Sequence, residues 1–314
     1  MRSQLFDGQS KKNDRQQYVM CPLSGHDRTN ESVMTRQHIL VHGKRYIMGI
    51  LIKKTLHPLV LFLFCTLCFS AAEGLAANKE LRISDAACDI QYASQRIAKT
   101  YFYKELDIRY EIAVQQLKEG IAELDNNIPV LQQGLQGKEQ DNIMKFLLSS
   151  YDKLKAILPK PYSNENGAMV IDASESLFEA AEFLAEAHLP KDRNTVEIML
   201  GDIQRQLRLL ERINKYYIAH HAGIENEDNF IQLKQSVSGF EAGISKITEQ
   251  ENHPEALDKH VNSINKLWPI AKDFYLGIQS RAQPVIVLAA TDKLIEELVA
   301  LEKHYKKEAS LTKK

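Results

Sequence analysis

Four arginines have the type and the spacing to hold a small anion. Arg96 and Arg212 stand in two similar segments, SQRIAKTY and LERINKYY. A guanidinium group is a planar fork of N–H donors that matches the oxygens of small oxyanions. Arg205 and Arg208 are three residues apart, so on a helix they share a face and can clamp one anion together. The alternative for each is an arginine on a helix surface, solvated or held in an ion pair.

The other polar side chains give weaker signals. His220 and His221 are adjacent, so on a helix they point about 100° apart and chelate one metal poorly. His253 and His260 are seven residues apart, two helical turns, which is too far for a compact metal site. The sequence contains no nucleophile elbow, P-loop or HExxH motif. We therefore expect no catalytic residue, no metal and no cofactor, and we expect that the protein is not an enzyme.

Five further residues are assigned structural places. Lys99 and Lys215 are expected to be solvated neighbours of the arginines. Tyr216 and Tyr217 are expected to line a buried helix seam, and Trp268 is expected to pack between helices.

The elements that position these residues are predicted to be helices. Apolar and small residues recur in steps of three and four, which is typical of the buried side of a bundle helix; they are Ile83, Ala87, Ile90, Ser94, Ile97 and Tyr101. Pro129 and Pro269 fall inside predicted helices, so they either kink them or show that the boundaries are wrong. The predicted helices cover about 80–105, 109–135, 139–158, 169–188, 192–222, 226–250, 254–281 and 284–308.

The sequence also repeats itself. Residues 94–131 align with 210–247 at a constant offset of 116, and the matches include arginine, lysine and tyrosine as well as apolar residues. The alignment continues at an offset of 113 for 149–157 and at 117 for 170–181. A shared amphipathic pattern alone would match only the apolar positions, so we interpret the match as a duplication. The predicted fold is all-α, with two tandem four-helix up-down bundle units.

The repeat gives domain boundaries of 78–190 and 191–314. The residues before it resemble a secretory signal peptide, because Lys53 and Lys54 precede eleven uncharged, mostly apolar residues and a stretch of small residues follows. We expect a signal segment over 48–77 that starts at Met48. Residues 1–47 are then expected to be a disordered extension that is not native. An inner-membrane anchor through 56–72 is the alternative.

Composition is that of an ordinary globular protein. The formal net charge of −1 gives no basic surface for nucleic acid. Of the four cysteines, Cys21, Cys65 and Cys68 precede the expected mature chain, so no internal disulfide is possible there. The remaining Cys88 is expected to be a small apolar helix residue.

The segments SQRIAKTY and LERINKYY, with VLAATDKLIEEL near the end, resemble the NarX-like sensor domain, which also forms the N-terminal part of the type IV pilus chemotaxis transducer PilJ. The resemblance covers about 80–308 in two copies. It implies a periplasmic sensor that binds a small anion such as nitrate or nitrite through arginines of the first helix. The first copy departs from the family there, with Cys88, Asp89, Ile90, Gln91 and Tyr92.

The expected function is therefore a periplasmic ligand-binding or sensory protein. Because no second membrane span or output domain follows in the sequence, it is expected to signal through a membrane histidine kinase or a chemotaxis transducer. Relatives act as dimers, so a homodimer is one expectation, although a tandem pair could supply the same contact within one chain. The alternative is a structural scaffold of the bacterial cell envelope.

Overall fold

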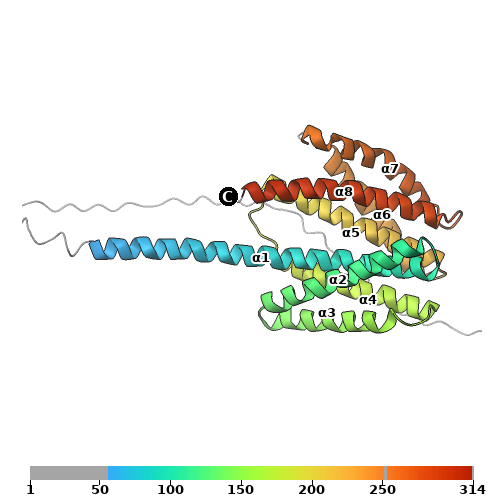
Figure 1. Ribbon diagram of the computed structural model, residues 1–314, viewed down its shortest axis with the longest axis horizontal. Coiled ribbons are helices and arrows are strands. Elements are labelled where there is room, and N and C mark those ends of the chain that lie inside the picture. Colours follow the sequence, from blue (N-terminus) through green and yellow to red (C-terminus); the bar gives the residue numbers. More distant parts are fainter. Residues whose placement is uncertain (1–55, 251–252, 313–314) are drawn as a thin grey trace, which may run out of the picture. The chain divides into compact units, whose positions relative to one another are not determined.

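The computed structural model describes residues 56–250 and 253–312, with side chains over 79–250 and 253–311 (Figure 1). In this part of the chain, all regular secondary structure is helical and no strand occurs, so the all-α prediction is confirmed. The eight helices of these residues are α1 (Leu56–Glu105), α2 (Tyr110–Gly134), α3 (Lys138–Ile157), α4 (Asn164–Ala187), α5 (Thr195–His221), α6 (Glu227–Thr248), α7 (Asp258–Leu276) and α8 (Pro284–Thr312). A 3-10 turn, Glu255–Leu257, precedes α7.

Side-chain caps explain where several helices begin. The hydroxyl of Ser163 accepts a hydrogen bond from the backbone N–H of Asn166 and starts α4. Asn194 and Glu197 form a reciprocal capping box at the start of α5. The prediction that the fourth helix starts near residue 169 is wrong. The polar residues NENG, which suggested a loop, form the first turn of α4 after the Ser163 cap.

Pro129 and Pro269 lie inside α2 and α7, and both helices continue through them. The predicted boundaries around these prolines therefore hold. Each proline leaves the carbonyl four residues earlier without its helical N–H donor. The end of the seventh helix differs from the prediction, since α7 stops at Leu276 rather than near residue 281.

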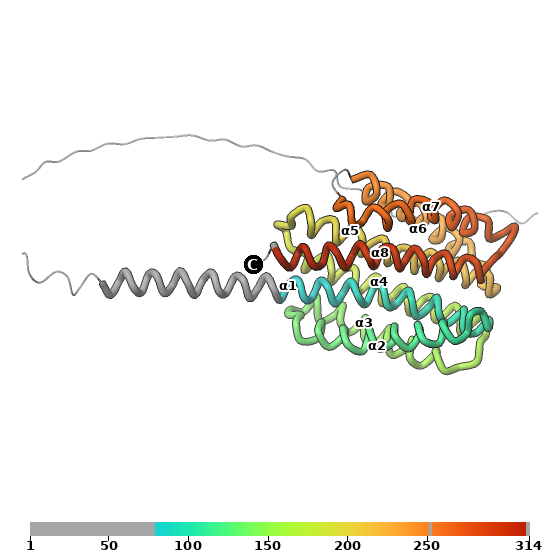
Figure 2. Tube along the Cα trace, turned by 45° about the horizontal axis from the view of Figure 1, so that its top comes forward, coloured from blue at the N-terminus to red at the C-terminus, as the bar shows by residue number. Residues whose placement is uncertain are grey.

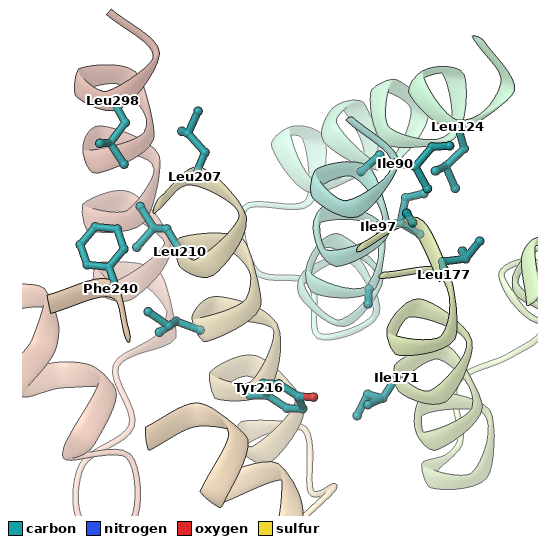
Figure 3. Packing of buried hydrophobic residues seen from close by; sticks show 14 of the residues in the cluster. Ile90, Ile97, Leu124, Ile171, Leu177, Leu207, Leu210, Tyr216, Phe240 and Leu298 are labelled. Carbon is teal, nitrogen blue, oxygen red and sulfur yellow. The ribbon is translucent and has the colours of Figure 1, made fainter. Parts of the chain in front are cut away.

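Helices α2 and α4 pack against α1. Gly120 of α2 brings its backbone so close to α1 that an added Cβ would lie 2.8 Å from Cγ1 of Ile97. The α4 helix is joined to α1 by Ser84, whose hydroxyl donates to the carbonyl of Ala185 over 3.4 Å. Helices α3 and α4 contact each other along their length. Figure 3 shows Ile90, Ile97, Leu124 and Leu177 from this group pointing toward one another.

The last four helices have their own apolar contacts. Helix α5 packs against α6 and α8, and α7 packs against α8. Trp268 of α7 is 5% exposed and its ring centroid lies 4.3 Å from that of Phe240, so the prediction that it packs between helices is confirmed. Figure 3 places Leu210 and Leu298 in the same group.

Helices α1 and α5 join the two groups. Lys99 contacts Glu211 over 2.7 Å, and the hydroxyl of Tyr103 donates to Oδ1 of Asn214 over 2.8 Å. Residue numbers rise together along both helices, so α1 and α5 run in the same direction. Residues 58–314 form one compact unit, in which α1–α4 lie on one side and α5–α8 on the other (Figure 2).

Most predictions for the N-terminal part concern residues that the structure does not describe. The extension 1–47, the start at Met48 and Cys21 lie outside the described residues. Residues 56–77 of the expected signal segment continue α1, and their side chains, including those of Cys65 and Cys68, are not described. Among the described residues, no helix is long and apolar enough to cross a membrane.

Candidate functional site

Three of the four predicted arginines share one groove. Arg205, Arg208 and Arg212 follow each other in steps of three and four along α5, so their side chains leave the same face of the helix. The groove that they line has a volume of about 680 Å³ and lies among α1, α4, α5 and α8. The prediction that Arg205 and Arg208 share a face is confirmed.

The fourth arginine lines a neighbouring groove. Arg96 of α1 faces a hollow of about 400 Å³ that is bordered by Asp89, Tyr92 and Glu123. Arg208 borders both grooves. The structure therefore does not bring Arg96 into the larger groove. Cys88, Gln204, Arg208 and Lys306 border both grooves, so Arg208 is the one predicted arginine that they share.

Arg96 and Arg212 are already engaged within the protein. Arg212 donates to Glu175 over 2.6 Å and to Gln232 over 3.1 Å. Its guanidinium carbon also lies 5.1 Å from the ring centroid of Phe178. Arg96 forms an ion pair with Glu119. For these two arginines, the structure matches the alternative of an ion-paired residue.

Arg205 and Arg208 differ from them. No carboxylate of the described residues lies within ion-pair distance of either one. Arg205 is exposed and Arg208 is half-buried. Arg208 lies beside Cys88, a half-buried residue that also lines the groove. Of the four predicted arginines, these two are therefore the ones without an ion pair that could receive an anion.

The wall of the larger groove is apolar over much of its length. Helices α1, α4 and α5 and the segment between α4 and α5 contribute Leu81, Phe178, Leu189, Leu200 and Leu209. Leu189 is 41% exposed. The groove thus combines an apolar side with arginine donors, a combination that sequence reasoning missed because its members come from separate helices.

Two cations of the groove were not predicted. Arg193 precedes α5, and Lys306 is in the last turns of α8. Lys306 pairs with Glu302 over 2.8 Å. Neither cation stands beside a sequence motif. They join the site only because α8 and the connection between α4 and α5 pack against α5.

Lys99 and Lys215 are not solvated, so that prediction is wrong. Both side chains are 0% exposed. Lys99 pairs with Glu211, and Lys215 pairs with Glu175 of α4. The physical reason is that α1 and α5 are enclosed on almost every side, which leaves no solvated face near these lysines.

Burial shifts the pKa of two groups in this region. Burial lowers the pKa of Lys215 to about 8, although the carboxylate of Glu175 opposes the shift. Asp89 borders the smaller groove, where poor solvation raises its pKa to about 6. Asp85 on the same helix and Glu302 of α8 also raise it, whereas Lys306 and Arg208 lower it.

Comparison of the chain with family models, with curated proteins and with solved structures finds no match. The site must therefore be interpreted from its own geometry.

The histidines are engaged separately. Nδ1 of His253 lies 2.9 Å from the hydroxyl of Tyr305, and Nδ1 of His260 lies 2.5 Å from Glu297. Within the described part of the chain, no group of three or more His, Cys, Asp or Glu side chains is placed to hold a metal ion. Tyr216 and Tyr217 are 3% and 0% exposed, as expected for residues of a buried seam.

Proposed function

We propose that this protein is a non-catalytic binding module whose anionic ligand lies in the groove among α1, α4, α5 and α8. The observation that carries the proposal is the pair Arg205 and Arg208. Among the described residues, both lack a carboxylate partner, and both face the same hollow. A charge-assisted hydrogen bond from such a donor is about twice as strong as a neutral one.

The place of the groove favours a sensory role. Its walls come from α1 and α4 of the first four helices and from α5 and α8 of the last four. A ligand there touches both groups at once. It can therefore shift their packing, provided that it binds two arrangements with different affinity.

We propose that the two groups arose by duplication. Supporting this, residues related by the sequence offsets have matching burial. Ile97 and Ile213 are both 0% exposed, as are Leu177 and Leu294. The parallel contact between α1 and α5 corresponds to the first-helix contact expected between two copies of a NarX-like or PilJ-like sensor domain. The tandem arrangement thus supplies within one chain what a homodimer supplies elsewhere.

We further propose that the module works in the periplasm and acts on a membrane histidine kinase or chemotaxis transducer. Export rests on the signal-like sequence over 48–77, with anchoring through 56–72 as the alternative. The partner follows from the resemblance to sensor domains.

Thermal unfolding in the presence of anions tests the proposal. The panel contains nitrate, nitrite, phosphate, acetate and longer organic carboxylates. A ligand present at 100 times its Kd should stabilise the fold by about 2.7 kcal/mol. Arg205→Gln and Arg208→Gln should reduce this stabilisation, and Arg281→Gln is the control. Arg281 is exposed, stacks on Phe274 and does not border either groove.

The proposal fails if no anion raises the unfolding temperature at millimolar concentration. It also fails if the three arginine variants respond equally.

The envelope scaffold is a second candidate, and exposed apolar residues favour it. Val285 and Ile286 at the start of α8 are 55% and 46% exposed, and Leu276 at the end of α7 is 40% exposed. Such residues are typical of docking surfaces when they are contiguous. If this candidate is right, Val285→Asp should abolish a complex in envelope extracts that forms without any added anion, and Arg205→Gln should leave that complex intact.

A further inference from the structure

The larger groove contains much more space than a small inorganic anion fills. Its volume of about 680 Å³ lies in the range of roughly 300–1,000 Å³ that is typical of pockets for organic ligands. An ion of three or four heavy atoms fills only a few times the roughly 30 Å³ of one water molecule. Most of the groove would then remain to be filled by something other than the ion.

The chemistry of the wall indicates what fills it. Phe178, Leu200 and Leu209 present apolar surface to the groove, and Leu81 and Leu189 extend it. Burying apolar surface contributes about 25 cal/mol per Å². A hydrated inorganic ion cannot use this wall, whereas a hydrocarbon chain or ring can.

The charges place the polar end of the ligand. Arg212 is occupied by Glu175 and Gln232, so its donors are largely committed. Of the arginines that α5 contributes to the groove, Arg205 and Arg208 are the donors left. Leu200 and Leu209 of the same helix line the groove beside them. The anionic group therefore belongs at Arg205 and Arg208, with the apolar body against the leucines.

The acidic residues of the groove limit the ligand's charge. Asp202 is held by Lys246 over 2.5 Å, and Glu197 caps the start of α5. Glu182 faces the arginines from α4 but forms no ion pair with them among the described residues. Burial, together with the neighbouring Glu186, raises the pKa of Glu182. These carboxylates favour a ligand with a single negative group over a polyanion.

We infer that the ligand is an amphipathic organic anion, with one carboxylate or similar head group on an apolar body. This inference rests on the proposed function and narrows it from anions in general to this chemical class.

Octanoate is the probe. Related compounds that carry only its charge or only its apolar body test the two ends of the ligand separately. Nitrate and acetate carry the charge without the body, octanol carries the body without the charge, and octylamine reverses the charge. Binding is measured by calorimetry and by thermal unfolding of the full chain. Octanoate should bind at least tenfold more tightly than acetate, nitrate, octanol or octylamine.

Three arginine variants and two leucine variants test the two ends of the ligand. Arg205→Gln and Arg208→Gln should each weaken octanoate binding about tenfold or more, as expected for loss of a charged hydrogen bond. Arg281→Gln should leave it unchanged. Leu189→Gln should weaken binding, whereas Leu276→Gln should not, although the two leucines are 41% and 40% exposed.

Cys88 tests whether the probe occupies this region. It borders both grooves, so octanoate should slow its alkylation in a peptide-resolved mass-spectrometric assay, which separates it from the other cysteines. The Arg205 and Leu189 variants then distinguish the grooves, because these two residues line only the larger one. Unchanged alkylation of Cys88 with octanoate bound would overturn the assignment to this groove.

The outcomes distinguish this inference from the proposed function. If nitrate or acetate binds as tightly as octanoate, and the Arg205 and Arg208 variants lose that binding, the proposed function stands and the amphipathic ligand is wrong. If octanol binds as well as octanoate, the assigned head-group contact is wrong. If none of the anions binds, both proposals fail.

Discussion

Buried charge is the main feature at the scale of single residues. Lys215 is fully buried, and Glu175, with a side chain only 16% exposed, contacts both Lys215 and Arg212. One carboxylate therefore neutralises two cations at the contact between α4 and α5. Removing the carboxylate should therefore cost much more stability than removing one of the two cations. A buried charge is costly when it loses the opposite charge that neutralises it.

We expect Glu175→Gln to destabilise the protein by about 3 kcal/mol or more, because it leaves Lys215 and Arg212 without their carboxylate. Lys215→Met should change stability by about 1 kcal/mol or less, because Glu175 keeps Arg212 as its partner. Urea unfolding at pH 7 measures both. Equal losses in the two variants would contradict this account.

The pKa of Lys215 predicts how stability depends on pH. The pKa is about 8 in the folded protein and 10.5 for an ordinary lysine. Between these values the unfolded chain binds more protons than the folded one, so this group makes the protein more stable as pH rises from 8 toward 10.5. Unfolding free energies at pH 7.5 and 9.5 should show a gain that Lys215→Met lacks. Lys303→Met, at an exposed position of α8, should retain the gain.

At the scale of elements, α1 acts as a central helix rather than as a surface helix with one buried side. The consecutive residues 97–103, which point in every direction around the helix, are all at most 1% exposed. The small residues Ala87, Ala93 and Ala98, all 0% exposed, let neighbouring helices approach closely. This explains why a glycine is required where α2 crosses α1.

Gly120 and Gly239 provide a matched test of that contact. A Cβ at Gly120 would lie 2.8 Å from Cγ1 of the buried Ile97, whereas a Cβ at Gly239 in α6 would meet only Cδ1 of Leu209 at 3.6 Å. We expect Gly120→Ala to destabilise by about 1–3 kcal/mol. Gly239→Ala should stabilise by up to about 1 kcal/mol, since alanine is the better helix former. Thermal unfolding of the two variants gives the sign of each change.

The buried lysines of α1 and α5 obtain their carboxylate partners from different helices. The offset of 116 relates Glu211 to Gln95, so only one of the two positions carries a carboxylate. Lys99 pairs with that Glu211, whereas Lys215 obtains its carboxylate from α4. Each lysine is thus neutralised by the opposite group of helices, through a different element.

At the scale of the whole molecule, these contacts should make the two groups of helices unfold together. The contact between α1 and α5 buries Lys99, Tyr103, Glu211 and Asn214, all of which are at most 1% exposed. Separating the groups would expose these ion-paired and hydrogen-bonded side chains along with apolar surface. Neither group is therefore expected to persist alone once the other has unfolded.

Trp268 allows this cooperativity to be measured. It is the only tryptophan, and it packs against Phe240 in the last four helices, so its fluorescence reports that group alone. Far-ultraviolet circular dichroism reports all helices. We expect the two signals to follow one denaturant transition with the same midpoint. A fluorescence transition that is separate from a second, dichroism-only transition would contradict cooperative unfolding.

The sequence by itself determined the helices and most of their ends, because apolar period and capping residues act locally. It also placed Arg205 and Arg208 on one face, since that follows from helix geometry alone. Only the tertiary structure decided that Arg96 lies apart from them, that Lys99 and Lys215 are buried, and that an apolar wall faces the arginines. These facts depend on which helix covers which face, and a lysine buried in an ion pair with another helix looks the same in the sequence as a solvated one.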